Sequence, residues 1–139
     1  EVQAAILRVK LPHLNEWIEN RRKVAARYID AFSELGIQLP LDPSYGTHAY
    51  HQFTIRVPDR DAFQKALQEA GVQTMVYYPV PLHLQQVHAM YGQGEGTFPH
   101  SEKAANEVIS LPMFPELKPE VQDQVIAAVK SVIKEKVPA

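Results

Sequence analysis

Apolar side chains recur at alternating steps of three and four along the first 35 residues. This spacing places them on one face of a helix, so the pattern predicts a long amphipathic helix over residues 3–35. Pro12 cannot sustain the helical hydrogen-bond ladder, and we expect a kink or two abutting helices near Leu11. An alternative is that part of this stripe packs against other parts of a longer protein. The stripe is formed by Leu7, Leu11, Leu14, Ile18, Ala25, Tyr28, Phe32 and Leu35.

The pattern changes to alternation over residues 50–57. This is typical of a half-buried strand, and the expected inward side chains are Phe53, Ile55 and Val57. A helix over residues 60–70 follows, with Asp59 as its N-cap and Gly71 as the glycine that closes it. The side chains expected to be buried on this helix are Phe63, Ala66, Leu67 and Ala70. Residues 72–78 then predict a second strand.

The second half of the chain predicts two short helices, an extended segment and a final helix. The short helices cover residues 84–91 and 101–108, with Ser101 as a cap for the second, and a glycine-rich loop separates them. Residues 109–115 are extended, and their prolines indicate a sheet edge or a strand end. The final helix begins near Pro119. Its apolar stripe is formed by Val121, Val125, Ile126, Val129, Val132 and Ile133.

The order of these elements predicts an α+β fold in a single domain over residues 1–139. We expect a small, mostly antiparallel sheet that is covered by helices on one face, with a long N-terminal helix. A chain of 139 residues is long enough to bury one core, and its 45% hydrophobic and 22% charged content is ordinary for a soluble globular protein. No apolar run reaches the length of a membrane span and nothing resembles a signal peptide, so we expect no membrane partner and a cytoplasmic location.

Charge and cysteine content exclude several classes of function. The formal net charge is -2, and the lysines and arginines are scattered rather than gathered in a basic stripe. We therefore expect no nucleic-acid partner. The chain has no cysteine, which excludes disulfides, thiolate metal sites and cysteine nucleophiles.

No metal site or catalytic group is expected either. His83 and His88 are five residues apart and miss the i, i+4 spacing of a helical zinc pair. His48 and His51 lie beside a strand at a spacing that places them on opposite faces. The glycines of residues 92–96 lack the preceding strand and the Lys-Ser/Thr of a phosphate-binding loop, and the chain has no G-x-S-x-G elbow. The carboxylates lie on predicted helix exteriors, so no acid/base pair is expected.

The stretch from Tyr77 to His83 is the strongest candidate for a site. It contains two prolines, which stop the preceding strand and make a stiff, extended exit. Tyr77, Tyr78 and His83 could form a binding surface there, helped by Arg56 and His51, because a tyrosine offers both a flat apolar face and a hydrogen-bonding tip. His83 could donate to a phosphate or a hydroxyl group. The alternative is that the tyrosines cap a core and His83 begins a helix.

Several motifs, taken in order, resemble a known family. They are Gln3-Ala4-Ala5-Ile6-Leu7, Tyr78-Pro79-Val80-Pro81-Leu82-His83, Phe98-Pro99-His100-Ser101-Glu102 and Ser110-Leu111-Pro112-Met113-Phe114-Pro115. Together they resemble the C-terminal small domain of the DegT/DnrJ/StrS family, which comprises pyridoxal-phosphate-dependent nucleotide-sugar aminotransferases of fold type I. The resemblance extends over nearly all 139 residues.

The resemblance implies transfer of an amino group, usually from glutamate or glutamine, to a keto-sugar linked to a nucleotide. It also implies a homodimer with active sites at the subunit interface, and pyridoxal phosphate in the full-length parent. The Schiff-base lysine would belong to a large domain before Glu1, and the chain begins without Met inside a helical pattern, as a piece of a longer protein would. The lysines of this chain lie on predicted helix exteriors or ends. We therefore expect no bound cofactor and no activity from this fragment alone.

The resemblance assigns this domain the tasks of closing over the site and presenting residues 77–83 to the substrate. Tyr78 and His83 match the family's motif, whereas Tyr77 stands where the family commonly has histidine. The alternative is a stand-alone, non-catalytic module that reuses the fold. Such a module would bind a nucleotide-sugar or a protein partner through Tyr77, Tyr78 and His83.

Overall fold

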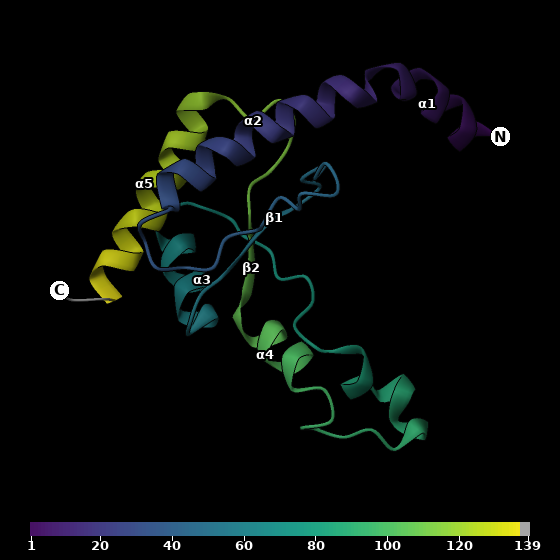
Figure 1. Ribbon diagram of the computed structural model, residues 1–139, viewed down its shortest axis with the longest axis vertical. Helices are drawn as coiled ribbons and strands as arrows, with labels where there is room; N and C mark the ends of the chain where they lie inside the picture. The colour runs from purple at the N-terminus through teal and green to yellow at the C-terminus, as the bar shows by residue number, and fades with distance from the viewer. Residues whose placement is uncertain (137–139) are drawn as a thin grey trace.

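The N-terminal segment up to Phe32 is helical, as predicted. The computed structural model describes residues 1–136, and it begins with helix α1 (Val2–Lys10), a 3-10 turn (Leu11–His13) and helix α2 (Leu14–Phe32). The predicted interruption near Leu11 is confirmed, because Pro12 lies in the 3-10 turn. Figure 1 shows α2 crossing the body of the protein while α1 extends away from it toward the N-terminus.

The central sheet is antiparallel, which confirms the predicted α+β class. Strand β1 (Phe53–Arg56) pairs with β2 (Val108–Leu111), with Phe53 opposite Leu111 and Arg56 opposite Val108. Single bridges extend the sheet on both sides, from Gln38 to Arg56 and from Met75 to Ser110. Strand β2 therefore lies inside the sheet, and the proline that follows it marks a strand end rather than an edge.

The predicted second strand over residues 72–78 is wrong, because only Met75 pairs with β2. Met75 and Ser110 exchange both backbone hydrogen bonds, at 3.1 and 2.7 Å. The next bonded pairs of an antiparallel ladder would need the N–H groups of residues 112 and 108. Pro112 has none, and the N–H of Val108 donates to the carbonyl of Ala104 to close the preceding helix. The ladder therefore stops after one pair.

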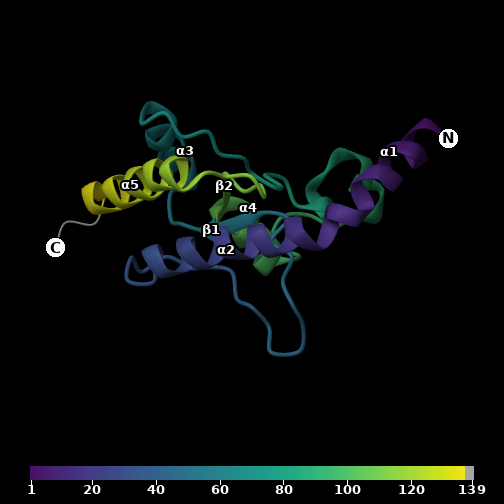
Figure 2. The same ribbon diagram turned by 90° about the horizontal axis from the view of Figure 1, so that it is seen from above.

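Helices α2, α3 (Arg60–Glu69) and α5 (Pro119–Lys136) enclose the core with the sheet. The alternation along β1 is confirmed, since Phe53, Ile55 and Val57 are buried whereas Thr54 and Arg56 are only partly covered. Figure 2 shows α2 and α5 at the sheet, and both helices contribute to the same cluster. The largest fully buried side chains are Tyr28, Phe32, Phe53, Phe63, Ile55, Leu67, Ile109 and Val129.

The predicted apolar stripes are buried only where a helix reaches this core. No residue of α1 is buried, and Leu7 and Leu11 are 64% and 67% exposed. Burial on α2 begins at Val24. The predicted burial of two further residues is also wrong. Ala70 is exposed because it follows the end of α3, and Val121 is 43% exposed on the first turn of α5.

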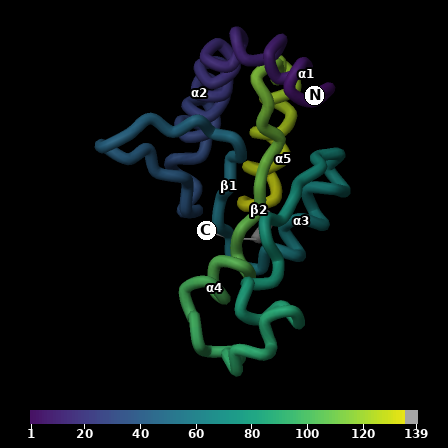
Figure 3. Tube along the Cα trace, turned by 90° about the vertical axis from the view of Figure 1, so that its right-hand side faces the viewer, coloured from purple at the N-terminus to yellow at the C-terminus, as the bar shows by residue number. Residues whose placement is uncertain are grey.

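Residues 76–107 form a separate feature, which we call the outer lobe. It contains two 3-10 helices (Leu82–Leu84 and Gln86–Tyr91) and helix α4 (Pro99–Glu107). Figure 3 shows that the lobe projects from the sheet, away from α2 and α5. The predicted helix over 84–91 is divided because Gln85 is extended, with φ -73° and ψ 137°. Ser101 is not a cap: α4 begins at Pro99, and Phe98 is its N-cap residue. Across residues 1–136, no helix is both long and apolar enough for a membrane crossing.

Candidate functional site

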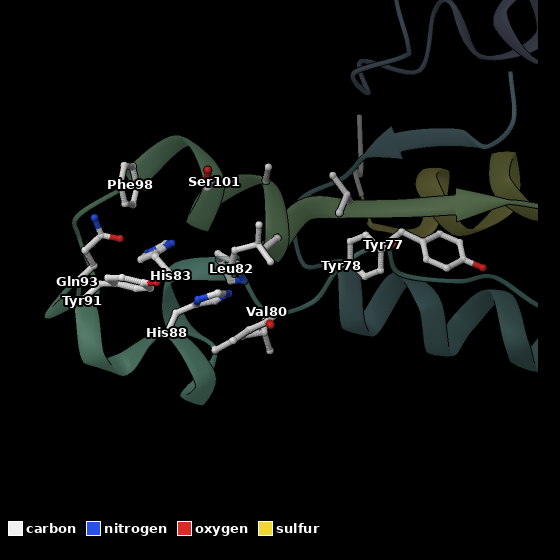
Figure 4. A pocket seen from close by; sticks show the side chains of 15 residues that line it. Tyr77, Tyr78, Val80, Leu82, His83, His88, Tyr91, Gln93, Phe98 and Ser101 are labelled. Atoms are coloured by element: carbon white, nitrogen blue, oxygen red, sulfur yellow. The ribbon is translucent and has the colours of Figure 1, made fainter. Parts of the chain in front are cut away.

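The outer lobe contains a cleft of about 710 Å³ between the segment after Met75 and helix α4. Tyr77, Tyr78 and His83 all line it, so the structure brings the three predicted site residues to one place (Figure 4). Most of the remaining lining is apolar or aromatic, and it includes Val80, Leu82, His88, Tyr91 and Phe98. A mostly apolar cleft with a few polar groups is the usual form of a small-molecule site.

The two tyrosines differ in their exposure and in what they contact. Their rings meet edge to face, with centroids 5.8 Å apart and planes inclined by 75°. Residue Tyr78 is 73% exposed, whereas Tyr77 is 37% exposed. Tyr77 also lines a second cleft of about 300 Å³, and its hydroxyl points away from His83 in Figure 4. Tyr78 therefore presents an open ring, and Tyr77 separates two clefts.

His83 is buried within the lobe, beside Phe98, rather than open to a ligand (Figure 4). Its side chain is 5% exposed, and its Nε2 lies 2.9 Å from Oε1 of Glu102. The Phe98 ring packs edge-on against the imidazole at a centroid distance of 4.9 Å. A carboxylate can only accept, so Nε2 carries the proton in this contact. Nε2 is therefore engaged in a contact within the protein. Of the two ring nitrogens, only Nδ1 is left to bind another partner.

Glu102 lies at the centre of the polar contacts in the lobe. Its oxygens accept from the backbone N–H of Gly96 at 3.0 and 2.9 Å and from that of Phe98 at 3.2 Å, in addition to the His83 contact. These bonds hold the pKa of Glu102 below its usual value, with the Gly96 N–H as the largest cause and the His83 side chain next. The available sequence signal was an acidic residue in the first turn after Pro99.

The two proposed helpers, Arg56 and His51, do not reach the main cleft. Arg56 donates to Oε2 of Glu107 from Nε at 3.1 Å and from a terminal nitrogen at 2.7 Å. His51 lines the second cleft together with Gln52 and Thr74. The hydroxyl of Thr74 is buried, and within residues 1–136 it has no hydrogen-bond partner. Both helpers therefore lie apart from Tyr78 and His83.

The lining of the main cleft does not fit pyridoxal phosphate by itself. Binding this group would require an amine for imine formation and cationic or N–H groups for the phosphate. Among the residues that the structure describes, no lysine or arginine lines the cleft. The same part of the chain contains no cluster of three His, Asp or Glu residues that could hold a metal ion. The arrangement can bind and orient a ligand, but its described lining supplies no amine for an imine.

Comparison with known families and proteins gives consistent matches. The model of the DegT/DnrJ/EryC1/StrS aminotransferase family matches residues 1–130. The chain is 54% identical over 129 residues to a pleiotropic regulatory protein of Geobacillus stearothermophilus, covering 91% of this chain and 35% of that protein. It is 41% identical over 134 residues to the UDP-N-acetyl-3-dehydro-alpha-D-glucosamine 3-aminotransferase of Acidithiobacillus ferrooxidans, covering 96% and 35%.

Solved structures match the fold as well. DesV of S. venezuelae, solved in complex with a ketimine intermediate, superposes with a TM-score of 0.92 at 37% identity, covering 95% of this chain and 36% of DesV. A DegT DnrJ EryC1 StrS aminotransferase from Brucella abortus superposes with a TM-score of 0.85 at 34% identity, covering 94% and 35%. The chain thus spans about a third of the length of the relatives that it matches.

Proposed function

Because this chain belongs to the DegT/DnrJ/EryC1/StrS aminotransferase family, we propose that it is the C-terminal small domain of a pyridoxal-phosphate-dependent nucleotide-sugar aminotransferase. The observation that carries the proposal is the family match over residues 1–130, together with relatives that are named as transaminases of dTDP- and UDP-linked sugars. The substrate would be a keto-sugar linked to a nucleotide. The fragment alone would be inactive.

In this proposal the chain contributes one wall of the substrate site. Tyr78 would offer its exposed ring to the sugar or the base, since an aromatic face packs against either. Tyr77 would border the same ligand beside the second cleft, and His83 would support the wall from beneath. The cofactor and its lysine would lie in residues beyond these 139, because the described lining offers neither an amine nor a cation.

The proposed full-length enzyme is a cytoplasmic homodimer that holds pyridoxal phosphate. A related structure supports the cofactor: NtdA of Bacillus subtilis, which is 36% identical to this chain, is described with bound cofactor PMP. The stand-alone binding module is not favoured, because the relatives are much longer proteins that are mostly named as aminotransferases.

The decisive experiment is to express the complete reading frame that contains this chain. With pyridoxal phosphate, glutamate or glutamine, and dTDP- and UDP-linked 3-keto-sugars, we expect an amino-sugar product by mass spectrometry. We expect no product and no cofactor absorbance from residues 1–139 alone. An unrelated upstream sequence, or a visible cofactor band from the fragment alone, would contradict the proposal.

A further inference from the structure

The outer lobe lacks the apolar core that supports the rest of the protein. In the part of the chain that the structure describes, the buried core cluster includes Val72 and Ile109 but no residue between them. Ala105 is buried in the lobe but lies outside that cluster. The lobe exposes large side chains instead, among them Tyr78, Leu82, Val87, Met90 and Tyr91. Apolar burial therefore does little to fix its shape, and polar contacts must do more.

Those polar contacts converge on one carboxylate. Glu102 accepts hydrogen bonds from the His83 side chain and from the backbone N–H groups of Gly96 and Phe98. The donors come from two separate segments, the first 3-10 helix and the loop before α4. We call this set of contacts the Glu102 clamp. Hydrogen bonds to a charged acceptor are stronger than neutral ones, so the clamp joins the two segments firmly.

The loop side of the clamp depends on a glycine. Gly96 has φ +86°, a conformation that residues with a Cβ rarely adopt, and both Glu102 oxygens accept from its N–H. The loop that Glu102 holds also carries Gln93 and Phe98, which line the cleft at the end away from Tyr78 (Figure 4). Closing the loop onto Glu102 therefore places one side of the cleft, and the bond to His83 fixes a second lining residue.

We propose that Glu102 is a positioning residue that keeps the cleft in the shape that receives the nucleotide-sugar. The ligand class rests on the proposed function, whereas the clamp itself rests on the contacts above. Glu102 acts on the substrate through other residues: it fixes the ring of His83 with the proton on Nε2 and holds the loop over residues 92–98. Without its carboxylate, the cleft loses its defined far wall while the core and the sheet remain.

Hydrogen exchange of the complete protein tests the clamp without any substrate. We compare the wild type with Glu102→Ala, Glu102→Gln and the control Glu95→Gln, an exposed carboxylate of the same loop. In Glu102→Ala we expect exchange over residues 82–98 to rise roughly tenfold or more, with Glu102→Gln in between and the control unchanged. Exchange in β1 and β2 should not change. Unchanged exchange in the lobe, or an equal rise in the sheet, would overturn the proposal.

Ligand binding tests the positioning role. By calorimetry with UDP-N-acetylglucosamine and dTDP-glucose as probes, we expect Glu102→Ala to weaken binding roughly tenfold, and Glu102→Gln to recover part of the loss. Faster exchange without weaker binding would overturn the positioning role. If the wild type binds neither probe, the proposed function fails, and the exchange experiment alone then decides whether the clamp exists.

Discussion

The body of this protein and its outer lobe are built on different physical principles. In the body, helices α2, α3 and α5 bury aromatic and aliphatic side chains against β1 and β2, and Tyr28, Phe32 and Phe53 are fully buried. In the lobe, short 3-10 helices and a loop surround a carboxylate, and the large apolar side chains face outward. Stability in the body comes from burial, whereas the shape of the lobe comes from directed hydrogen bonds.

The two regions are therefore suited to different roles, support in the body and presentation of exposed rings in the lobe. A close-packed core resists deformation, so it can hold the lobe in place without lining the cleft itself. A surface fixed by a few polar contacts can leave its aromatic rings open to a ligand. The two regions meet where Met75 pairs with Ser110 and where α4 runs directly into β2. Mutations should therefore act on the two regions separately, and the following predictions test this separation.

The largest expected effect is on the core. Phe53 is fully buried and its ring lies 5.0 Å from that of Tyr28, so Phe53→Ala should lower the free energy of unfolding by about 3–5 kcal/mol. The matched lobe variant is Phe98→Ala, which removes a ring that is 44% exposed and should cost about 1 kcal/mol or less. Urea denaturation monitored by circular dichroism measures both. Equal losses would show that the lobe shares the core's cooperative packing.

A second prediction concerns a polar contact within the body. The hydroxyl of Tyr28 donates to the carbonyl of Pro112 at 3.0 Å, and burial raises the pKa of this phenol well above its usual value. Tyr28→Phe keeps the ring but leaves that carbonyl without its donor, so unfolding should become easier by about 1–2 kcal/mol. Exchange in the lobe should be unaffected. A change over residues 82–98 in this variant would contradict the separation of the two regions.

The parts that could be predicted from the sequence are those governed by short-range patterns. The alternation of Phe53, Ile55 and Val57 reports on one strand and its apolar face, and it is confirmed. The spacing along α2 is confirmed only over its second half, where Ala25, Tyr28 and Phe32 are buried. The strand over 72–78 could not be judged in the same way. Whether this segment continues as a strand depends on the N–H of Val108. That group donates to the carbonyl of Ala104 at the end of α4 instead. Only the tertiary arrangement decides that competition.

The proximity of the three candidate site residues could be predicted from the sequence, but the contacts that hold them in place could not. Two prolines and two adjacent tyrosines predict a stiff exit that presents its side chains together, and Tyr77, Tyr78 and His83 all line one cleft. The pairing of His83 with Glu102 joins residues that are 19 positions apart in the sequence. No periodicity encodes such a contact. The absence of Arg56 from the cleft has a similar cause, since its guanidinium pairs with Glu107 across the sheet edge.

A third prediction concerns acid. The folded-state pKa of Glu102 is lowered, so the stability that its carboxylate gives to the lobe is present above the usual glutamate range and is lost as the pH falls through the folded-state value. The groups that face this carboxylate are the His83 imidazole and the N–H groups of Gly96 and Phe98. Below about pH 4.3, protection over residues 82–98 should fall before that of β1 and β2. Exchange corrected for its intrinsic rate measures this order. Simultaneous loss in both regions would count against it.

The smallest expected effect on stability, and the sharpest test of the division of labour, is at Tyr78. Its side chain is 73% exposed and lies outside the core cluster, so Tyr78→Ala should change the free energy of unfolding by less than about 0.5 kcal/mol. If its ring receives the sugar or the base, the same variant of the complete protein should weaken nucleotide-sugar binding roughly tenfold, since stacking on an aromatic face contributes about 1–3 kcal/mol per base.

Val87→Ala is the control, because this residue is 71% exposed on the same lobe and does not line the cleft. Equal binding by the two variants would remove Tyr78 from the site, whereas a large loss of stability would place it in the framework of the lobe.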